Sequence, residues 1–177
     1  MSSEPRRDPA ADDRLTPPNA AFLNDWNSLA RVLRDLHAAL LRRARTEYMR
    51  ERGIAEEIGP GELLMLATRD EGFAWLRSLS ELMTDIDYLR DDPAIAKGQE
   101  LRSAVRGAVE ELLRPPGDEA AASAFAAKYW EHVNADPDVT MAHAAVKQAL
   151  AGWPTPQGTG HKEVAQHRQM MGKQRGS

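Results

Sequence analysis

Apolar side chains recur every three or four positions from about residue 18 to about residue 150, and no stretch alternates apolar with polar residues. Spacing of three and four places side chains on one face of an α-helix, whereas a half-buried β-strand needs alternation. Short breaks rich in glycine and proline divide the pattern into segments that can pack side by side. We therefore predict an all-α fold, a roughly antiparallel four-helix bundle with two additional short helices.

The breaks also set the predicted helix boundaries. The first helix runs from about Pro18 to Arg52, and Gly53 ends it. Its apolar seam consists of Phe22, Trp26, Leu29, Leu33, Leu36, Leu40 and Ala44. The other predicted helices are short ones over ELLMLAT and about 137–150, and longer ones over about 71–91, 93–113 and 118–134. Asp92 and Asp136 each precede a proline, which is typical of a helix N-cap followed by the first helical residue.

The two ends of the chain differ in composition from its middle. Residues 1–18 are rich in proline and charge, so we predict a disordered N-terminal arm. Residues 154–177 combine proline, glycine and scattered basic side chains, which favours a flexible C-terminal tail. Residues 19–153 would then form one helical bundle domain, which is large enough to close a core.

Composition excludes several classes of protein. The chain has no cysteine, which rules out disulfides, zinc-thiolate sites, iron-sulfur clusters and cysteine nucleophiles. A net charge of -4 and a pI near 5.8 argue against nucleic-acid binding as the main role. No apolar run is long enough to span a membrane and no secretory signal is evident, so we expect a cytoplasmic protein. The excess of arginine over lysine, 18 to 5, suggests a GC-rich bacterial genome.

Paired acids in the stretch FAWLRSLSELMTDID raise the question of a metal or acid–base site. At about 100° per residue, Asp85 and Asp87 fall on opposite borders of an apolar helical face, so one helix cannot direct both at one ion. The chain also lacks phosphate-binding loops, nucleophile elbows and dinucleotide-binding fingerprints. We therefore assign no metal site and no catalytic residue, and we lean against an enzyme.

Two histidines are the candidates for ligand binding. His143 lies on an apolar face with alanines beside it, which leaves room around the ring, and His37 lies at the edge of the first helix's seam. The structural interpretation is a buried imidazole with a hydrogen-bond partner. The functional interpretation is a small-ligand or haem-binding bundle in which both histidines contact the ligand. Its cavity would be lined by Trp26, Trp75 and Tyr129.

Charged residues of the first helix form two further patterns. On the side opposite the seam lies an arginine stripe, which could bind a protein partner, with Arg31, Arg34, Arg42, Arg45 and Arg52 as its members. On the seam side, Glu47 and Glu51 continue the inward face. We predict that they either overhang the core or form salt bridges, with Arg43 as a partner.

Two functional hypotheses remain open. The first is a non-enzymatic interaction or regulatory module, acting through a protein partner or through self-association as a homodimer. It rests on the arginine stripe, on apolar helical surface beyond the needs of a four-helix core, and on small residues that permit close helix contact, namely Gly98, Ala104, Gly107 and Ala108. The alternative is the small-ligand or haem-binding bundle, with haem the minority case. A cavity beside His143 would favour the alternative.

Overall fold

The computed structural model describes residues 18–91, 98–117, 123–157 and 160–175, and these ranges contain helices and connections but no strand. The all-α prediction is therefore confirmed. The predicted N-terminal arm and the Asp92 cap fall outside the described ranges. None of the described helices is both long and apolar enough to cross a membrane. In order, the helices are α1 (Pro18–Arg52), α2 (Pro60–Arg69), the 3-10 helix η2 (Glu71–Leu76), α3 (Arg77–Arg90), α5 (Gln99–Leu112), α6 (Ala124–Ala135), α7 (Pro137–Leu150) and α8 (Gly160–Arg175).

Helix α1 is the longest element and the centre of the fold. Its 35 residues span about 52 Å at 1.5 Å per residue. The predicted seam is confirmed from Trp26 to Ala44, because these side chains are fully or almost fully buried. Gly53 follows the helix with a φ of 64°, a left-handed conformation that glycine adopts without strain, so the predicted end is also confirmed.

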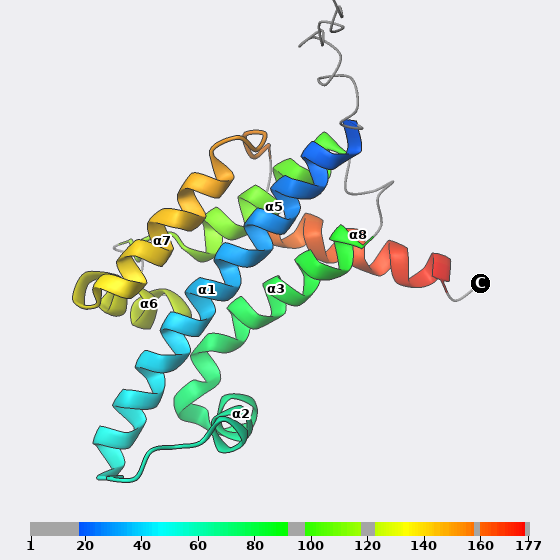
Figure 1. Ribbon diagram of the computed structural model, residues 1–177. Coiled ribbons are helices and arrows are strands. Elements are labelled where there is room, and N and C mark those ends of the chain that lie inside the picture. The colour runs from blue at the N-terminus through cyan, green and yellow to red at the C-terminus, as the bar shows by residue number, and fades with distance from the viewer. Residues whose placement is uncertain (1–17, 92–97, 118–122, 158–159, 176–177) are drawn as a thin grey trace, which may run out of the picture.

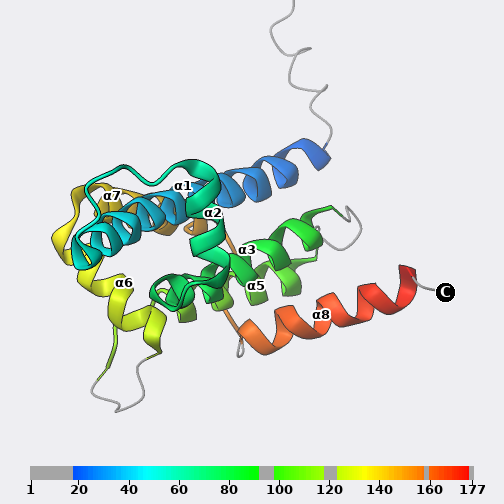
Figure 2. The ribbon, with the colours of Figure 1, turned by 90° about the horizontal axis from the view of Figure 1, so that it is seen from below.

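The helices around α1 form two groups. Helix α7 packs along one side of α1, and α3 packs along the other (Figure 1). Helix α5 pairs mainly with α8, and this pair lies against α3 (Figure 2). The predicted four-helix bundle is not confirmed. Helix α7 was predicted as a short additional helix and α8 was not predicted, yet α7 is the main neighbour of α1 and α8 is the main neighbour of α5.

A 3-10 turn interrupts the helix that was predicted over residues 71–91. The Asp70 carboxylate accepts a hydrogen bond of 2.8 Å from the backbone nitrogen of Gly72, and this cap starts η2 before α3 begins at Arg77. Asp136 acts in the same way at α7, where its Oδ1 accepts hydrogen bonds from the backbone nitrogens of Asp138 and Val139. The predicted cap at Asp136 is therefore confirmed.

Most of the C-terminal segment that was expected to be a flexible tail forms a helix, α8, over Gly160–Arg175. Val164 on this helix is 1% exposed and belongs to the core. Gly160 packs directly on the α5 backbone: a Cβ there would lie 2.5 Å from the Ala104 carbonyl oxygen and closer still to the Ala108 nitrogen. The close approach predicted from small residues of α5 thus occurs inside the fold.

An ion pair with one buried partner and two tryptophans hold the start of α1 to α5 and to the α7–α8 connection. Arg102 is 5% exposed, and its guanidinium lies 2.7 Å from Asp25. The same guanidinium sits 4.9 Å from the centre of the Trp153 ring, which packs edge-on against Trp26. Trp153 therefore fixes the chain at the point where α7 ends and the connection to α8 begins.

Candidate functional site

The five residues predicted to bind a ligand do not form one site. His143 and Tyr129 do come together, with the Tyr129 hydroxyl 2.5 Å from His143 Nδ1. Trp26 is buried against Trp153, and Trp75 packs against Phe125 and His132. The Nε2 of His37 lies 3.0 Å from the Ser80 hydroxyl of α3, so His37 faces a different element from His143. The structure therefore does not direct the two histidines at one haem.

A cleft of about 360 Å³, here called the His143 cleft, opens beside His143. It lies where the end of α5 meets α6 and α7. Its lining residues are Val109, Glu110, Leu113, Arg114, Pro115, Trp130, His143, Lys147 and Leu150. A cavity beside His143 was the feature expected to favour a ligand-binding role over a purely structural histidine.

Burial changes the titration of both hydrogen-bonded groups at this cleft. It lowers the pKa of His143, and the positive charge of Lys147 lowers that pKa further. Burial also raises the pKa of the Tyr129 hydroxyl well above its ordinary value. Near neutral pH, Tyr129 is therefore a protonated phenol beside a neutral imidazole.

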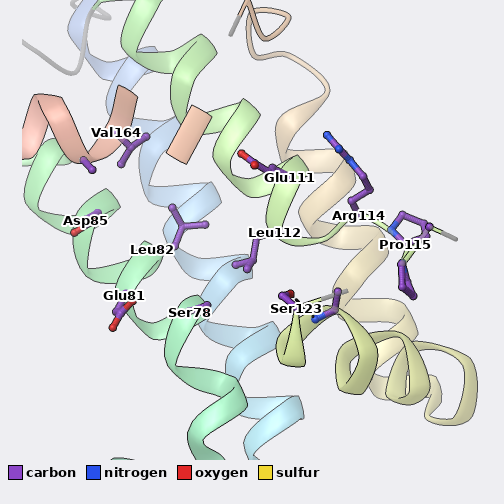
Figure 3. Close-up of a pocket in the computed structure, with 14 residues that line it drawn as sticks. Ser78, Glu81, Leu82, Asp85, Glu111, Leu112, Arg114, Pro115, Ser123 and Val164 are labelled. Atoms are coloured by element: carbon purple, nitrogen blue, oxygen red, sulfur yellow. Dashed lines mark hydrogen bonds between the residues drawn. The ribbon is translucent and has the colours of Figure 1, made fainter. Parts of the chain in front are cut away.

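A separate groove of about 510 Å³ lies between α3, the end of α5, the start of α6 and α8; it is shown in Figure 3 and is here called the acidic groove. Its apolar lining includes Leu82, Leu112 and Val164. Around these side chains lie three carboxylates and one guanidinium, those of Glu81, Asp85, Glu111 and Arg114. The sequence did not indicate this groove, because its walls come from segments far apart in the chain.

Arg114 and Pro115 line both hollows. Substituting either residue would therefore change both at once. Side chains that line only one hollow, such as Glu81 for the acidic groove and Lys147 for the His143 cleft, are the ones that can separate their roles.

A third polar cluster is buried between α1 and α6. The Glu47 side chain is 13% exposed, and its carboxylate lies 3.6 Å from His132, 3.7 Å from Lys128 and 3.9 Å from Arg43. The predicted salt bridging of Glu47 with Arg43 is confirmed, and α6 adds two partners that spacing within α1 could not reveal. Glu51, by contrast, is exposed.

His132 of α6 is a fully buried member of this cluster. His132 is 1% exposed, and its ring packs 5.5 Å from the ring of Trp75. Neither ring nitrogen has a hydrogen-bond partner among the described residues. Burial lowers the pKa of His132, although the nearby carboxylates of Glu47 and Glu131 act in the opposite direction.

Acids of the same chain neutralise much of the predicted arginine stripe. Arg31 lies 3.7 Å from Asp35, and Arg45 lies 3.3 Å from Glu57. Arg52 lies 3.5 Å from Asp70. Of the other two members, Arg34 donates to the Ala30 carbonyl one turn earlier, and Arg42 borders a small hollow together with Asp136 and Asp138. The stripe is therefore a weaker docking surface than its sequence suggested.

The paired acids of α3 are separated as predicted. Asp85 lines the acidic groove, whereas Asp87 lies 3.2 Å from Arg90. Between them runs the buried face that contains Leu79, Leu82 and Ile86. Within the described ranges, no three histidine or acidic side chains are grouped so that they could hold a metal ion.

Comparison with known proteins adds no further constraint, because no family model, curated protein or solved structure matches this chain.

Proposed function

We propose that the protein is a non-enzymatic interaction module of the cytoplasm that self-associates, with the acidic groove receiving the second half of α8 from another copy. The observation that carries this proposal is the groove itself, a hollow of about 510 Å³ with the Glu81 carboxylate at its edge, beside Asp85 and Glu111, which also have interactions of their own within the chain. An occupant that matches it is a basic segment with apolar side chains.

Apolar and acidic side chains have different roles in this groove. Leu82, Leu112 and Val164 form the floor of the groove; they are 1–8% exposed, so a partner's apolar side chain would meet only the small part of them that the core leaves uncovered. Glu81 and Asp85 lie along the α3 edge of the groove (Figure 3). Carboxylates at the edge of an apolar surface attract a cationic partner and select its orientation more than they add to its affinity.

The chain itself carries a segment of the required chemistry. After Glu163 the sequence contains no acidic residue, but it has basic residues at Arg168, Lys173 and Arg175 and two methionines at Met170 and Met171. Methionine adapts its shape readily to an apolar surface. In both views the far end of α8 extends beyond the ends of α3 and α5 (Figures 1 and 2).

In a two-fold symmetric dimer, α8 of each copy would dock in the acidic groove of the other. Dimers are most often related by a two-fold axis, so each copy gives and receives the same contact. If such an axis passes near residue 168, the α8 helices of two copies run antiparallel. The axis pairs positions that lie equally far before and after residue 168, so residue 172 of one copy lies beside Val164 of the other. Within one copy, residue 172 is about 12 Å along the helix from Val164. Val164 and Ala165 line the acidic groove, so the basic end arrives at its mouth.

Light scattering or sedimentation velocity of the full chain over a range of concentrations tests this proposal. We expect a dimer for the natural sequence, and at least about tenfold weaker association for the double variant Glu81→Lys/Asp85→Lys. The variant Lys173→Glu/Arg175→Glu should weaken it similarly. An equal mixture of the two variants should restore association, because the reversed charges are again complementary.

The matched control is Glu56→Lys/Glu62→Lys, which makes the same charge change at exposed positions that do not line the groove. This control should associate like the natural protein. A natural protein that stays monomeric at all concentrations would overturn the proposal. So would a dimer that survives both charge reversals unchanged.

A further inference from the structure

We propose that the His143 cleft is a second, independent binding site that takes a small aromatic carboxylate. The His143 ring would donate a hydrogen bond to the carboxylate, Lys147 and Arg114 would supply positive charge, and Trp130 would contact the aromatic ring. This inference does not depend on self-association, since His143, Trp130 and Lys147 do not line the acidic groove.

The hydrogen bond between Tyr129 and His143 determines which atom of the imidazole faces the ligand. The Tyr129 side chain is 0% exposed, and His143 Nδ1 is the only acceptor within reach of its hydroxyl among the described residues. A buried hydroxyl proton without an acceptor costs free energy, so the hydroxyl donates to Nδ1. A neutral imidazole that accepts at Nδ1 carries its proton on Nε2.

The Nε2–H group is therefore the free polar group of the ring. It has no hydrogen-bond partner among the described residues, although His143 lines the cleft. A protonated Nε2 donates to an oxygen acceptor and cannot ligate a metal, because metal ligation needs the lone pair of that nitrogen. The contact with Tyr129 thus favours an anionic oxygen ligand over haem at this position.

Two cations line the same cleft. Lys147 comes from the same helix as His143, one turn later, and Arg114 lies two residues after the end of α5. Neither forms a salt bridge with an acid among the described residues. Glu110 also lines the cleft, but its carboxylate is held 2.8 Å from Arg106. The surplus of positive charge therefore selects an anion, and a carboxylate can accept from Nε2–H and from a cation together.

The other walls select an aromatic body for that anion. The Trp130 ring meets the His143 ring edge-on at 5.4 Å, and the Trp130 indole nitrogen donates to the Leu113 carbonyl, which fixes its orientation. Val109, Leu113 and Leu150 complete an apolar side. A volume of about 360 Å³ lies at the lower end of the range for small-molecule sites and fits a ligand with one or two rings.

Calorimetric titration of the full chain with benzoate and indole-3-acetate tests the inference, with benzyl alcohol as the neutral analogue and benzylamine as the cationic one. We expect at least one of the two carboxylates to bind, and the alcohol and the amine to bind at least about tenfold more weakly. Lys147→Gln should weaken carboxylate binding by about tenfold, since it removes one charge-assisted contact. His143→Phe should weaken it by a similar factor.

Lys162→Gln is the matched control for Lys147→Gln, because Lys162 is an exposed lysine of α8 that lines neither hollow. It should leave carboxylate binding unchanged. Circular dichroism and thermal unfolding of each variant separate lost binding from lost folding. The inference is overturned if neither carboxylate binds, if the alcohol binds as tightly as the acid, or if folded Lys147→Gln binds like the natural protein.

Discussion

At the scale of single residues, one buried and two half-buried histidines place the strongest constraint on this protein. Burial lowers the pKa of His37, His132 and His143, and each ring contacts a side chain of another helix. His132 is the extreme case, because both of its nitrogens lack hydrogen-bond partners among the described residues. Protonating such a ring therefore lowers the stability of the folded state.

The first prediction follows from linkage between protonation and folding. A histidine whose pKa is lower in the folded state binds fewer protons there than in the unfolded chain, where the pKa is about 6.5. The contribution of these neutral histidines to the free energy of unfolding is therefore fully present above about pH 6.5. It is lost as the pH falls from there through their lowered folded-state pKa values. We expect a lower free energy of unfolding, measured with urea, at about pH 5 than at about pH 7.5.

His132→Gln should reduce this loss on acidification, because glutamine does not titrate. The groups that face His132 are Glu47 and Arg43 of α1 and Lys128 and Glu131 of α6, and all four remain in the variant. His167→Gln makes the same change on α8 and serves as the control. An acid sensitivity that is identical in the natural protein and in His132→Gln would contradict the role given to this ring.

Residue-level features were only partly predictable from the sequence. The inward position of Glu47 could be predicted, because it continues a long and regular seam. The burial of His132 could not, since the surface that covers it comes from Trp75 and Glu47, which are remote in sequence. Likewise, the apolar face around His143 was visible in the sequence, but its bond to Tyr129 depends on how α6 packs on α7.

At the scale of elements, the quality of prediction follows the strength of the apolar pattern. Helix α1 has a continuous seam and a glycine stop, and its core residues and its end were both predicted correctly. Helix α8 has no such seam, and it was expected to be flexible. Among its described residues, Gly160 is buried through a backbone contact and Val164 through its side chain, and neither produces a periodic signal.

Gly160→Ala should therefore weaken the packing of α8. A methyl group there collides with backbone atoms of Ala104 and Ala108, and backbone cannot move aside as a flexible side chain can. We expect a loss of at least about 1–3 kcal/mol in the free energy of unfolding, the usual cost of overpacking. Denaturant unfolding followed by tryptophan fluorescence measures it.

Gly152→Ala is the matched control, because a Cβ at Gly152 meets no atom within 4 Å and its φ is not positive. Its effect should stay within about 0.5 kcal/mol, as for other surface substitutions. Equal stabilities of the two alanine variants would show that α8 is not held by the contact at Gly160.

At the scale of the whole molecule, charge is distributed unevenly although the net charge is only -4. Acids gather at the acidic groove, whereas basic residues dominate the chain after Glu163. The all-α class could be predicted from periodicity alone. The hollows could not, because each is formed by side chains from at least three helices whose relative positions the sequence does not specify.

The proposed dimer should therefore depend on salt. Raising sodium chloride from about 0.05 M to about 0.5 M shortens the screening length from roughly 14 Å to roughly 4 Å, which weakens attraction between exposed charges. We expect the dissociation constant from sedimentation velocity to rise by about tenfold over this range. An affinity that stays constant or increases with salt would instead indicate a contact dominated by apolar burial.

The two ends of α8 differ in how much added bulk they accept, which matters when a reporter is attached to the protein. The first residue of α8 is wedged against α5 and admits no added atom, while the far end projects beyond its neighbours. In the proposed dimer, a fluorescent protein fused after residue 177 would stand in the way of the second copy. A label intended to follow assembly in cells therefore belongs before residue 1.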